Sequence, residues 1–427
     1  MNNNSTLIGQ LKRDLLNFSE KISAGLNRPT MKFIANMLYG LIVSQSIMLT
    51  DIGRALNEDI SLKKTEDRLS RNLKPLCQDI GSIQNRYIEE VKPSVDDRTI
   101  FCIDPSDICK KYGRCQEGLD WIRDASEKKS AWGWNYYEVT ALTHSNKLPI
   151  PVYSQVVAAD APRSVTYTHT DEILEAIRST QRHFGAIGIT TIDRGGDANP
   201  IFKHCIDSEQ KFIIRNKVNR NLIVGDESIN IATIADGMKG KFRLDHKDKY
   251  GKHHTLKTSF KSVRLPCRPD EDLTLIIVYG FGKEPPMLLL TNMTVLGKET
   301  CLRIVKIYLC RWRIDEYFRF IKDQFHLENI RVLSMESICA LVFLLSVLSG
   351  WIAMFANKKG ESLLLAAVLV RAKRLYAIPN FTLYAVADGI YDILKHAVKG
   401  IRPALSKPPQ SQQLSLFEPS NFNLPAV

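Results

Sequence analysis

The sequence lacks the patterns that mark zinc knuckles, disulfide frameworks and nucleotide-binding loops. Its nine cysteines are odd in number, and no two of them are spaced as Cys-x-x-Cys, so neither structural zinc nor a set of disulfides is indicated. It has no glycine-rich phosphate loop and no internal repeat. Residues 1–5 show neither the charged nor the apolar part of a signal peptide. We therefore expect a reducing, intracellular compartment and a cytoplasmic protein.

Negative charge is also scarce relative to positive charge. The 427 residues include 58 Lys and Arg but 46 Asp and Glu, which gives a formal net charge of +12. With 44% hydrophobic and 24% charged residues, the chain is expected to bury a sizeable core in more than one domain. The positive surplus indicates a polyanionic partner, with nucleic acid ahead of an anionic membrane surface. Lysines that serve only solubility are the alternative explanation.

Long apolar runs are rare, and one segment alone approaches the length of a membrane span. Residues 337–355 contain no charged residue, and a spanning helix needs about 20 apolar residues. Three serines and a glycine interrupt the run: Ser337, Ser346, Ser349 and Gly350. We predict a helix buried on all sides inside a large domain and no membrane partner. A membrane anchor remains the minority alternative.

Residues 1–95 are predicted to form a helical DNA-binding domain. Residues 49–56 and 61–73 have the pattern of a short helix, a turn and a second, basic helix, which is typical of a helix-turn-helix. The candidates for phosphate contacts are Lys63, Lys64, Arg68 and Arg71, and those for base edges are Ser70 and Asn72. A small helical bundle with a solvated basic face is the alternative.

Strand patterns begin after residue 96 and alternate with helical ones, as in an α/β domain. Strands are predicted at 99–103, 136–143, 151–157, 186–192 and 211–215. A helix is predicted at 171–184, with Thr170 as its N-cap. A second helix is expected from Glu299 to beyond Lys322, and the tail from Pro403 is rich in Pro, Ser and Gln and is expected to be disordered.

Residues 216–300 are predicted to form an antiparallel β region. Its middle, 241–264, holds eight Lys or Arg residues and two acids. Such a ribbon could follow the backbone of a DNA duplex. It could equally be an exposed hairpin without a partner, and the sequence does not separate the two.

Two aspartates, Asp104 and Asp193, each directly follow a predicted buried strand. In an open α/β sheet, catalytic groups gather at the carboxyl ends of the strands. A third carboxylate comes from the helix after residue 299. At about 100° per residue one face of that helix carries a phenol, three cations and one carboxylate, and these are Tyr308, Arg311, Asp315, Arg319 and Lys322. Glu316 lies on the flank of the same helix.

Three carboxylates at one sheet edge, Asp104, Asp193 and Asp315, can hold two divalent cations in the arrangement that serves phosphoryl transfer. Oxygen donors favour Mg²⁺ or Mn²⁺ over zinc. Nearby cations would then hold phosphates in line. The alternatives are a turn-capping role for each strand-end aspartate and a surface stripe of salt bridges on the helix.

The helix pattern Tyr308-x-x-Arg311-x-x-x-Asp315-x-x-x-x-x-x-Lys322 is similar to the Tyr-Arg-Glu-Lys signature of the DDE transposases encoded by bacterial insertion sequences. Most of residues 60–335 share in the resemblance. Three further segments contribute to it: 103–107 resembles the surroundings of the first catalytic Asp of that family, 193–197 with 211–215 the second, and 66–73 the DNA-binding region.

The resemblance implies an RNase H-like catalytic domain, here residues 96–215 and 301–360, interrupted by a β insertion at 216–300. Residues 361–427 would then form a C-terminal helical region with its tail. The family implies two Mg²⁺ ions and a homodimer assembled on double-stranded DNA, both transposon ends and target, in a bacterial nucleoid. Its chemistry is hydrolytic nicking followed by 3′-hydroxyl attack, often through hairpin-ended intermediates.

By the same resemblance Asp104 and Asp193 are expected to bind metal. Tyr308, Arg311 and Lys322 are expected to contact the DNA end, together with Arg194 and Arg319. The sequence departs from the family at one place, where Asp315 replaces a glutamate and Glu316 follows it. Asp315 is the first choice for the third ligand and Glu316 the second. A metal-dependent nuclease without strand transfer, or a decayed DNA-binding protein, are the alternative functions.

Overall fold

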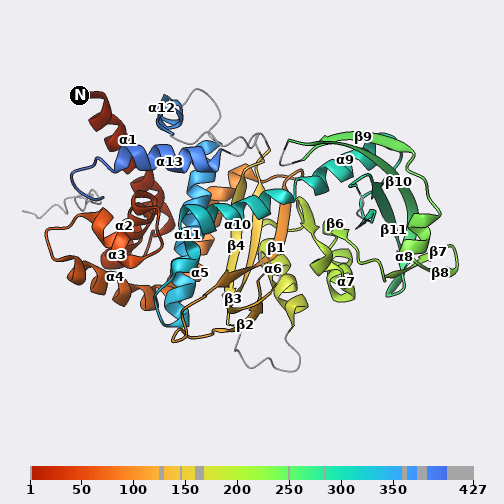
Figure 1. Ribbon diagram of the computed structural model, residues 1–427, viewed down its shortest axis with the longest axis horizontal. Helices are drawn as coiled ribbons and strands as arrows, with labels where there is room; N and C mark the ends of the chain where they lie inside the picture. Colours follow the sequence, from red (N-terminus) through yellow and green to blue (C-terminus); the bar gives the residue numbers. More distant parts are fainter. Residues whose placement is uncertain are drawn as a thin grey trace, which may run out of the picture.

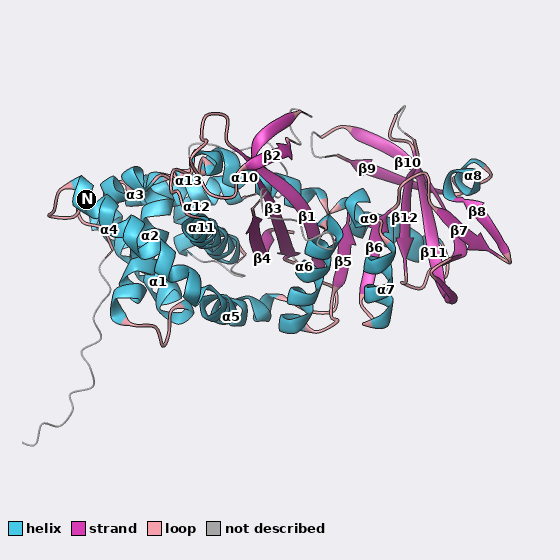
Figure 2. Cartoon of the chain, turned by 90° about the horizontal axis from the view of Figure 1, so that it is seen from below, coloured by secondary structure: helices cyan, strands magenta, loops and turns pink. Residues whose placement is uncertain are grey.

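The computed structural model describes residues 2–124, 129–144, 147–158, 168–248, 251–282, 285–357, 363–372 and 382–401. Figure 1 shows helices gathered at one end of an elongated molecule and a long sheet that extends to the other end, and Figure 2 shows the same division from below. The predicted tail from Pro403 lies outside the described residues. The α/β class predicted from the sequence is confirmed.

The N-terminal region is helical, as predicted. Its helices are α1 (Asn2–Ile22), α2 (Arg28–Ser44), α3 (Leu49–Leu56), α4 (Leu62–Leu76) and α5 (Ile80–Val91). The Asn27 side chain caps α2 by accepting from the Thr30 N–H, and Asn57 ends α3 in the left-handed conformation that asparagine tolerates. The predicted succession of short helix, turn and basic helix is therefore present as α3 and α4.

Helix α11 (Met335–Ala356) forms the centre of the helical end. It packs against β4 of the sheet and against α2, α4, α5 and α13 (Leu383–Leu394). Gly350 lies directly against the Tyr87 hydroxyl, where a Cβ would find no room. Among the described residues, α11 is the one helix that is by itself long and apolar enough to cross a membrane, and 89% of its apolar stretch is buried inside the molecule. Helices α2 and α3 reach that length and hydropathy only when taken together, and they are bent by 98° relative to each other. The prediction of an interior helix is confirmed.

In the described part of the chain, twelve strands form one continuous sheet. They are β1 (Ile100–Cys109), β2 (Asp120–Arg123), β3 (Ser130–Leu142), β4 (Pro149–Val157), β5 (Ile189–Ile192), β6 (Lys211–Arg215), β7 (Asn221–Val224), β8 (Glu227–Asn230), β9 (Phe242–Lys247), β10 (His253–Leu265), β11 (Arg268–Tyr279) and β12 (Met287–Thr291). The order is β2-β3-β1-β5-β6-β12-β11-β10-β7-β8, with β4 on β3 and β9 on β10. Strands β1, β5 and β6 are parallel to one another, and the other pairs are antiparallel.

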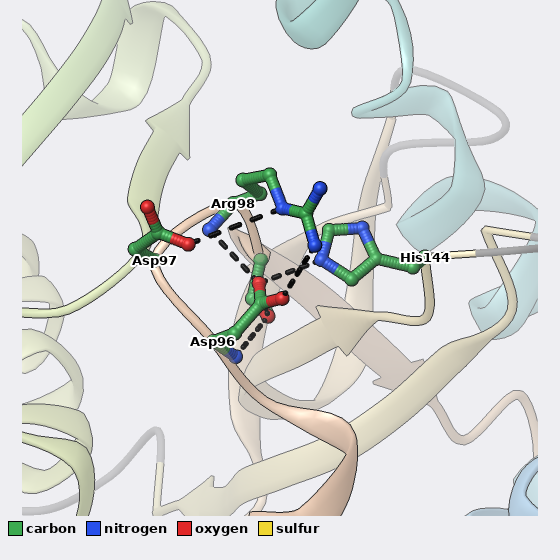
Figure 3. Close-up of polar contacts among 5 residues, drawn as sticks. Asp96, Asp97, Arg98 and His144 are labelled. Carbon is green, nitrogen blue, oxygen red and sulfur yellow. Dashed lines mark hydrogen bonds and ion pairs between the residues drawn. The ribbon is translucent and has the colours of Figure 1, made fainter.

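The remaining helices lie between the strands or after them. Those between strands are α6 (His169–Phe184), α7 (Asn199–Asp207) and α8 (Ile231–Asp236), and those after β12 are α9 (Lys298–Leu309), α10 (Trp312–Gln324) and α12 (Leu363–Arg371). Short 3₁₀ turns lie at Cys77–Asp79, Lys92–Ser94, Arg194–Gly196 and Leu327–Asn329. The first residues of β1 are fixed by a polar cluster (Figure 3), in which the Asp96 carboxylate meets His144 Nε2 at 2.6 Å and Arg98 Nη2 at 3.2 Å. Burial acts to raise the pKa of Asp96, but these partners outweigh it and hold the pKa below its usual range.

Several predicted element boundaries are wrong, each for a local reason. The strand at 99–103 continues to Cys109, because β3 pairs with it along its whole length after the parallel pairing with β5 has ended. The N-cap of α6 is Thr168 and not Thr170, since the Thr168 N–H donates to the Asp171 carboxylate at 2.6 Å. The strand predicted at 186–192 begins at Ile189, after Gly188 at φ +75°.

The helix predicted from 299 past 322 is in fact two helices, α9 and α10. Around the break, Arg311 N–H bonds Tyr308 O and Ile314 N–H bonds Arg311 O, three residues back in each case. A tight turn of this kind interrupts the regular helix. The 100° spacing assumed across residues 308–322 therefore holds only within α10.

The 241–264 segment forms the β9–β10 hairpin. Leu244 and Leu256 are buried on its inner face, against α9, while Arg243, Lys247 and Lys257 are exposed on the outer face. Lys249 lies outside the described residues. An outer face of this composition fits both sequence-based alternatives, a DNA-facing ribbon and a solvated hairpin.

Candidate active site

Asp104 and Asp193 lie next to each other at one edge of the parallel strands. The β1–β5 pairing ends with Ile103 opposite Ile192. Asp104 is the next residue of β1, and Asp193 is the first residue after β5. Because neighbouring strands are about 4.8 Å apart, two residues at the same register position are close in space. The sequence-based expectation that these two carboxylates share a sheet edge agrees with this register.

Asp315 joins them through Arg311, which stands between α9 and α10. Arg311 Nη1 is 3.2 Å from Asp104 Oδ2, and Arg311 Nη2 is 3.3 Å from Asp315 Oδ2. The guanidinium therefore bridges the strand carboxylate and the helix carboxylate. The break in the helix places Arg311 at the N-terminal end of α10, one turn before Asp315.

Three carboxylates meet at this site, and Arg311 pairs with two of them. Burial raises the pKa of Asp104 well above its usual value; Arg311 opposes this, and the carboxylates of Asp315 and Asp193 reinforce it. Burial acts to lower the pKa of Arg311, but Asp104 and Asp315 outweigh it and raise that pKa. Carboxylates gathered in this way form a set that a divalent cation would stabilise.

Glu316 does not take part in this cluster. Its side chain is buried, and Oε1 accepts from Arg319 Nη1 at 2.8 Å. Asp315, the preceding residue of the same helix turn, faces Arg311 instead. The geometry thus distinguishes the two neighbouring acids: one lies at the sheet edge and the other packs into the interior.

Tyr308 and Arg215 border the cluster on the side of Asp193. Burial raises the pKa of the Tyr308 hydroxyl to about 12; Arg311 and Arg215 act against this shift, and Asp193 adds to it. Arg194, predicted to contact DNA, is exposed directly after Asp193 and is a charged neighbour of Arg215. Sequence reasoning did not identify Arg215 as a site residue. The sequence did offer one indication of its role, because Arg215 ends β6, the strand beside β5.

The other two predicted cations of α10 already have acidic partners. Lys322 Nζ is 2.9 Å from Asp107 Oδ2 and 3.4 Å from Glu328 Oε1. Arg319 pairs with Glu316. A DNA contact by Lys322 or Arg319 would therefore be made either alongside these ion pairs or by replacing them.

The basic residues of α4 differ in their exposure. Lys63, Lys64 and Arg71 are exposed, and Lys63 forms only an i,i+4 pair with Asp67 at 3.1 Å. Arg68 is half-buried and bonds Glu58 at 2.6 Å across the turn between α3 and α4. Of the two base-edge candidates, Ser70 is exposed, while the Asn72 amide donates to the Arg68 carbonyl. The exposed members remain predicted DNA contacts.

The loop after Asp193 is held firmly. Asp193 Oδ1 accepts from the Gly195 N–H at 2.7 Å. Asp197, at the other end of the loop, is buried and accepts from Asn216 Nδ2 at 3.0 Å and from the Lys217 N–H at 2.6 Å. Arg220 Nε donates to the same carboxylate. These bonds tie the Asp193 loop to the segment that follows β6.

A second acidic group lies further along β1. Among the described residues, one group of potential metal-ligating side chains has all its ligand atoms within 4.8 Å of one another. It consists of Asp107, Cys109 and Asp124. Cys109 Sγ donates to Asp107 Oδ2 at 3.2 Å, and burial, reinforced by Asp107, raises the pKa of that thiol. Lys322 is already paired to Asp107, so this carboxylate has a cationic partner within the protein.

Comparison with known proteins gives one family and several distant solved structures. The family model described as "Transposase DDE domain" matches residues 96–349, more than half of the chain. No curated protein matches the sequence. A cryo-EM structure of a piggyBac transposase synaptic complex with hairpin DNA is 10% identical with a TM-score of 0.46, over 90% of this chain and 77% of that one. An endonuclease V variant from Ciona intestinalis, in complex with DNA, is 10% identical with a TM-score of 0.26, over 58% of this chain and 98% of that one.

Proposed function

The chain belongs to the family of the transposase DDE domain, enzymes that cut DNA and transfer its strands, and from this premise we propose that Asp104, Asp193 and Asp315 are its catalytic carboxylates. One observation carries the proposal. Within the matched residues 96–349, the register of β1 and β5 sets two aspartates side by side, and Arg311 links them to a third on α10. In this proposal Glu316 is not a metal ligand, and the burial of its carboxylate against Arg319 supports that choice.

The proposed catalytic domain is RNase H-like. The strand order β4-β3-β1-β5-β6, with β1, β5 and β6 parallel and β3 antiparallel to β1, supports this assignment. In the proposal, residues 96–215 and 301–360 form the catalytic domain, 216–300 the β insertion, 1–95 the DNA-binding domain and 361–427 the C-terminal region. Helix α11 would then be shared, because it packs on both β4 and the N-terminal helices.

The donor set fits divalent metal ions, on which DDE transposases depend. The three carboxylates offer only oxygen atoms, and burial together with the neighbouring Asp315 and Asp193 raises the pKa of Asp104. We propose Mg²⁺ or Mn²⁺, because both prefer oxygen ligands. When bound, the ions would activate the attacking water or 3′-hydroxyl and stabilise the leaving oxygen.

The protein's own residues would position the DNA. Arg215, Tyr308 and Arg194 surround Asp193 and would hold phosphates next to the carboxylates, while the exposed cations of α4 would bind the duplex away from the cut site. The partner is double-stranded DNA, at transposon ends and target. A homodimer assembled on that DNA, in the bacterial cytoplasm at the nucleoid, completes the proposal.

The test uses the purified protein, Mg²⁺ and a labelled DNA fragment carrying the ends of its own element. Wild type is expected to nick the end and transfer it to target DNA. Asp104→Asn and Asp193→Asn are expected to abolish both steps while DNA binding survives, because neither carboxylate is part of the α4 surface. Unchanged cleavage in both variants would overturn the site assignment.

Two further comparisons in the same assay refine the proposal. Asp315→Asn is expected to abolish cleavage and Glu316→Gln to retain it, if the folded amount of each is matched. Cleavage by wild type without any strand transfer would support the nuclease alternative instead. Binding without cleavage would support the decayed DNA-binding protein.

A further inference from the structure

His169 stands at the catalytic centre without having been assigned a part in it. It is the first residue of α6. Its Nδ1 lies 2.8 Å from the hydroxyl of Tyr137, a buried residue of β3. A Cβ placed on Gly195 would lie 3.4 Å from His169 Nε2 and 2.9 Å from Asp193 Oδ1. The imidazole and the Asp193 carboxylate therefore border the same glycine.

The bonding of the ring decides what Nε2 can offer. A phenol O–H is a stronger donor than an imidazole N–H, and a neutral imidazole nitrogen is a good acceptor. Tyr137 thus donates to Nδ1, and the ring proton is assigned to Nε2. Burial lowers the pKa of His169, opposed by Asp193 and aided by Lys217, which agrees with a neutral ring. Nε2–H then points toward the Asp193 side as a donor.

The surroundings favour a phosphate over a metal as the group that His169 meets. Arg194, Arg215 and Lys217 are the cations on this side of Asp193, and none of them forms an ion pair within 4 Å with a described residue. Unpaired cations beside the end of a strand fit an anionic backbone. The proposed ions prefer oxygen donors, so a nitrogen ligand is not called for.

We propose that His169 is a catalytic residue that donates a hydrogen bond from Nε2 to a phosphate oxygen of the DNA strand held over Asp193, with Tyr137 as the positioning residue that fixes the ring. The inference rests on the proposed function of Asp193. It adds a neutral donor beside Asp193. A neutral donor stabilises charge that develops on the phosphate without drawing the carboxylates away from their cations.

The test measures single-turnover cleavage of the labelled DNA end by the full-length protein in Mg²⁺ at saturating protein. His169→Ala is expected to slow cleavage by roughly 100-fold, the effect of losing one preorganised donor, with DNA affinity changed by less than about threefold. His169→Gln, which keeps an N–H donor, is expected to recover much of the rate. His183→Gln, a change of the second histidine of α6 at its far end, is the matched control and should cleave as wild type.

Tyr137→Phe separates positioning from packing. It should slow cleavage by less than His169→Ala, and the double variant should be no slower than His169→Ala alone, because Tyr137 acts only through the ring. A double variant that is slower by the product of the two effects would contradict the positioning role. Thermal unfolding of each variant checks that the fold is intact.

Failure of this inference is distinguishable from failure of the proposed function. If Asp193→Asn is inactive while His169→Ala and His169→Gln both cleave as wild type, the His169 assignment is wrong and the carboxylate site stands. If Asp193→Asn cleaves as wild type, the site assignment itself is wrong, and the His169 proposal falls with it. Equal loss in His169→Ala and His169→Gln would also overturn the donor role.

Discussion

Two acidic clusters lie between β1 and α10, and they differ in how their charge is balanced. In the first, Arg311 pairs with Asp104 and Asp315, while Asp193 has no ion pair within 4 Å to a described residue. In the second, Asp107 has Lys322 at 2.9 Å and a protonated thiol at 3.2 Å. The second cluster is the more compact, yet the first is the one that a cation would stabilise. Compactness of acidic groups is therefore a poorer guide to a metal site than an excess of carboxylates at the edge of a sheet.

The largest expected difference between the clusters is in activity. Asp104→Asn should reduce cleavage by more than the roughly 10- to 100-fold typical of a residue that only supports a metal ligand. Asp107→Asn should leave cleavage within that range, because its partner is a lysine and not the reacting DNA. The two variants are compared in one end-cleavage assay at matched folded protein. Equal losses would mean that the clusters act as one site.

The next difference is in stability. Lys322→Met leaves the buried Asp107 carboxylate without its closest cation, and breaking a buried pair costs about 3 kcal/mol or more. Urea unfolding should show that loss, and Asp107→Asn added to Lys322→Met should restore part of it. If Lys322 serves only as the DNA contact that its sequence position suggests, unfolding will be unchanged and DNA affinity alone will fall.

Metal ions should separate the clusters in the absence of DNA. Mg²⁺ or Mn²⁺ at about 100 times its dissociation constant adds about 2.7 kcal/mol to a protein that binds it only when folded. Thermal unfolding of wild type and Asp107→Asn is expected to shift upward with Mn²⁺, whereas Asp193→Asn shifts much less. A shift that is lost in Asp107→Asn and kept in Asp193→Asn would move the metal site to the second cluster.

Sequence patterns predicted the first cluster well because strand ends and helix spacing are local properties. Asp104 and Asp193 each follow an apolar strand, and parallel register alone then brings them together. The sequence could rank Asp315 above Glu316 as the third ligand but could not decide between them. The decision depends on the turn at Arg311, which divides the predicted helix into α9 and α10. Arg311 in that turn pairs with Asp104 of β1, a residue distant in the sequence.

Other features could not be predicted for the same reason. Lys322 pairs with Asp107, a residue 215 positions away in the sequence. A helical wheel compares only residues of one helix, so it predicted a DNA contact for Lys322 and could not predict this ion pair. His169 was overlooked because its meaning depends on Tyr137 across the sheet and on Gly195 in another loop. The predicted N-cap Thr170 was wrong by two residues, since Thr168 and Asp171 make the cap.

The smallest expected difference is the response of stability to pH. Because the pKa of Asp104 is raised in the folded state, the folded protein keeps a proton that the unfolded chain releases above about pH 4. The unfolded state then binds fewer protons, so this carboxyl makes stability fall as the pH rises from about 4 toward the raised folded pKa. Asp104→Asn removes the effect and should unfold at a higher temperature than wild type at pH 7.5 in chelator, by a few degrees, as about 1 kcal/mol gives in a large domain. The gain should shrink toward pH 4.5.

Asp107→Asn is the control, because it removes a carboxylate that is paired with a lysine. It should show no gain in unfolding temperature at pH 7.5. A gain of equal size there would mean that the charge of the two clusters is balanced in the same way.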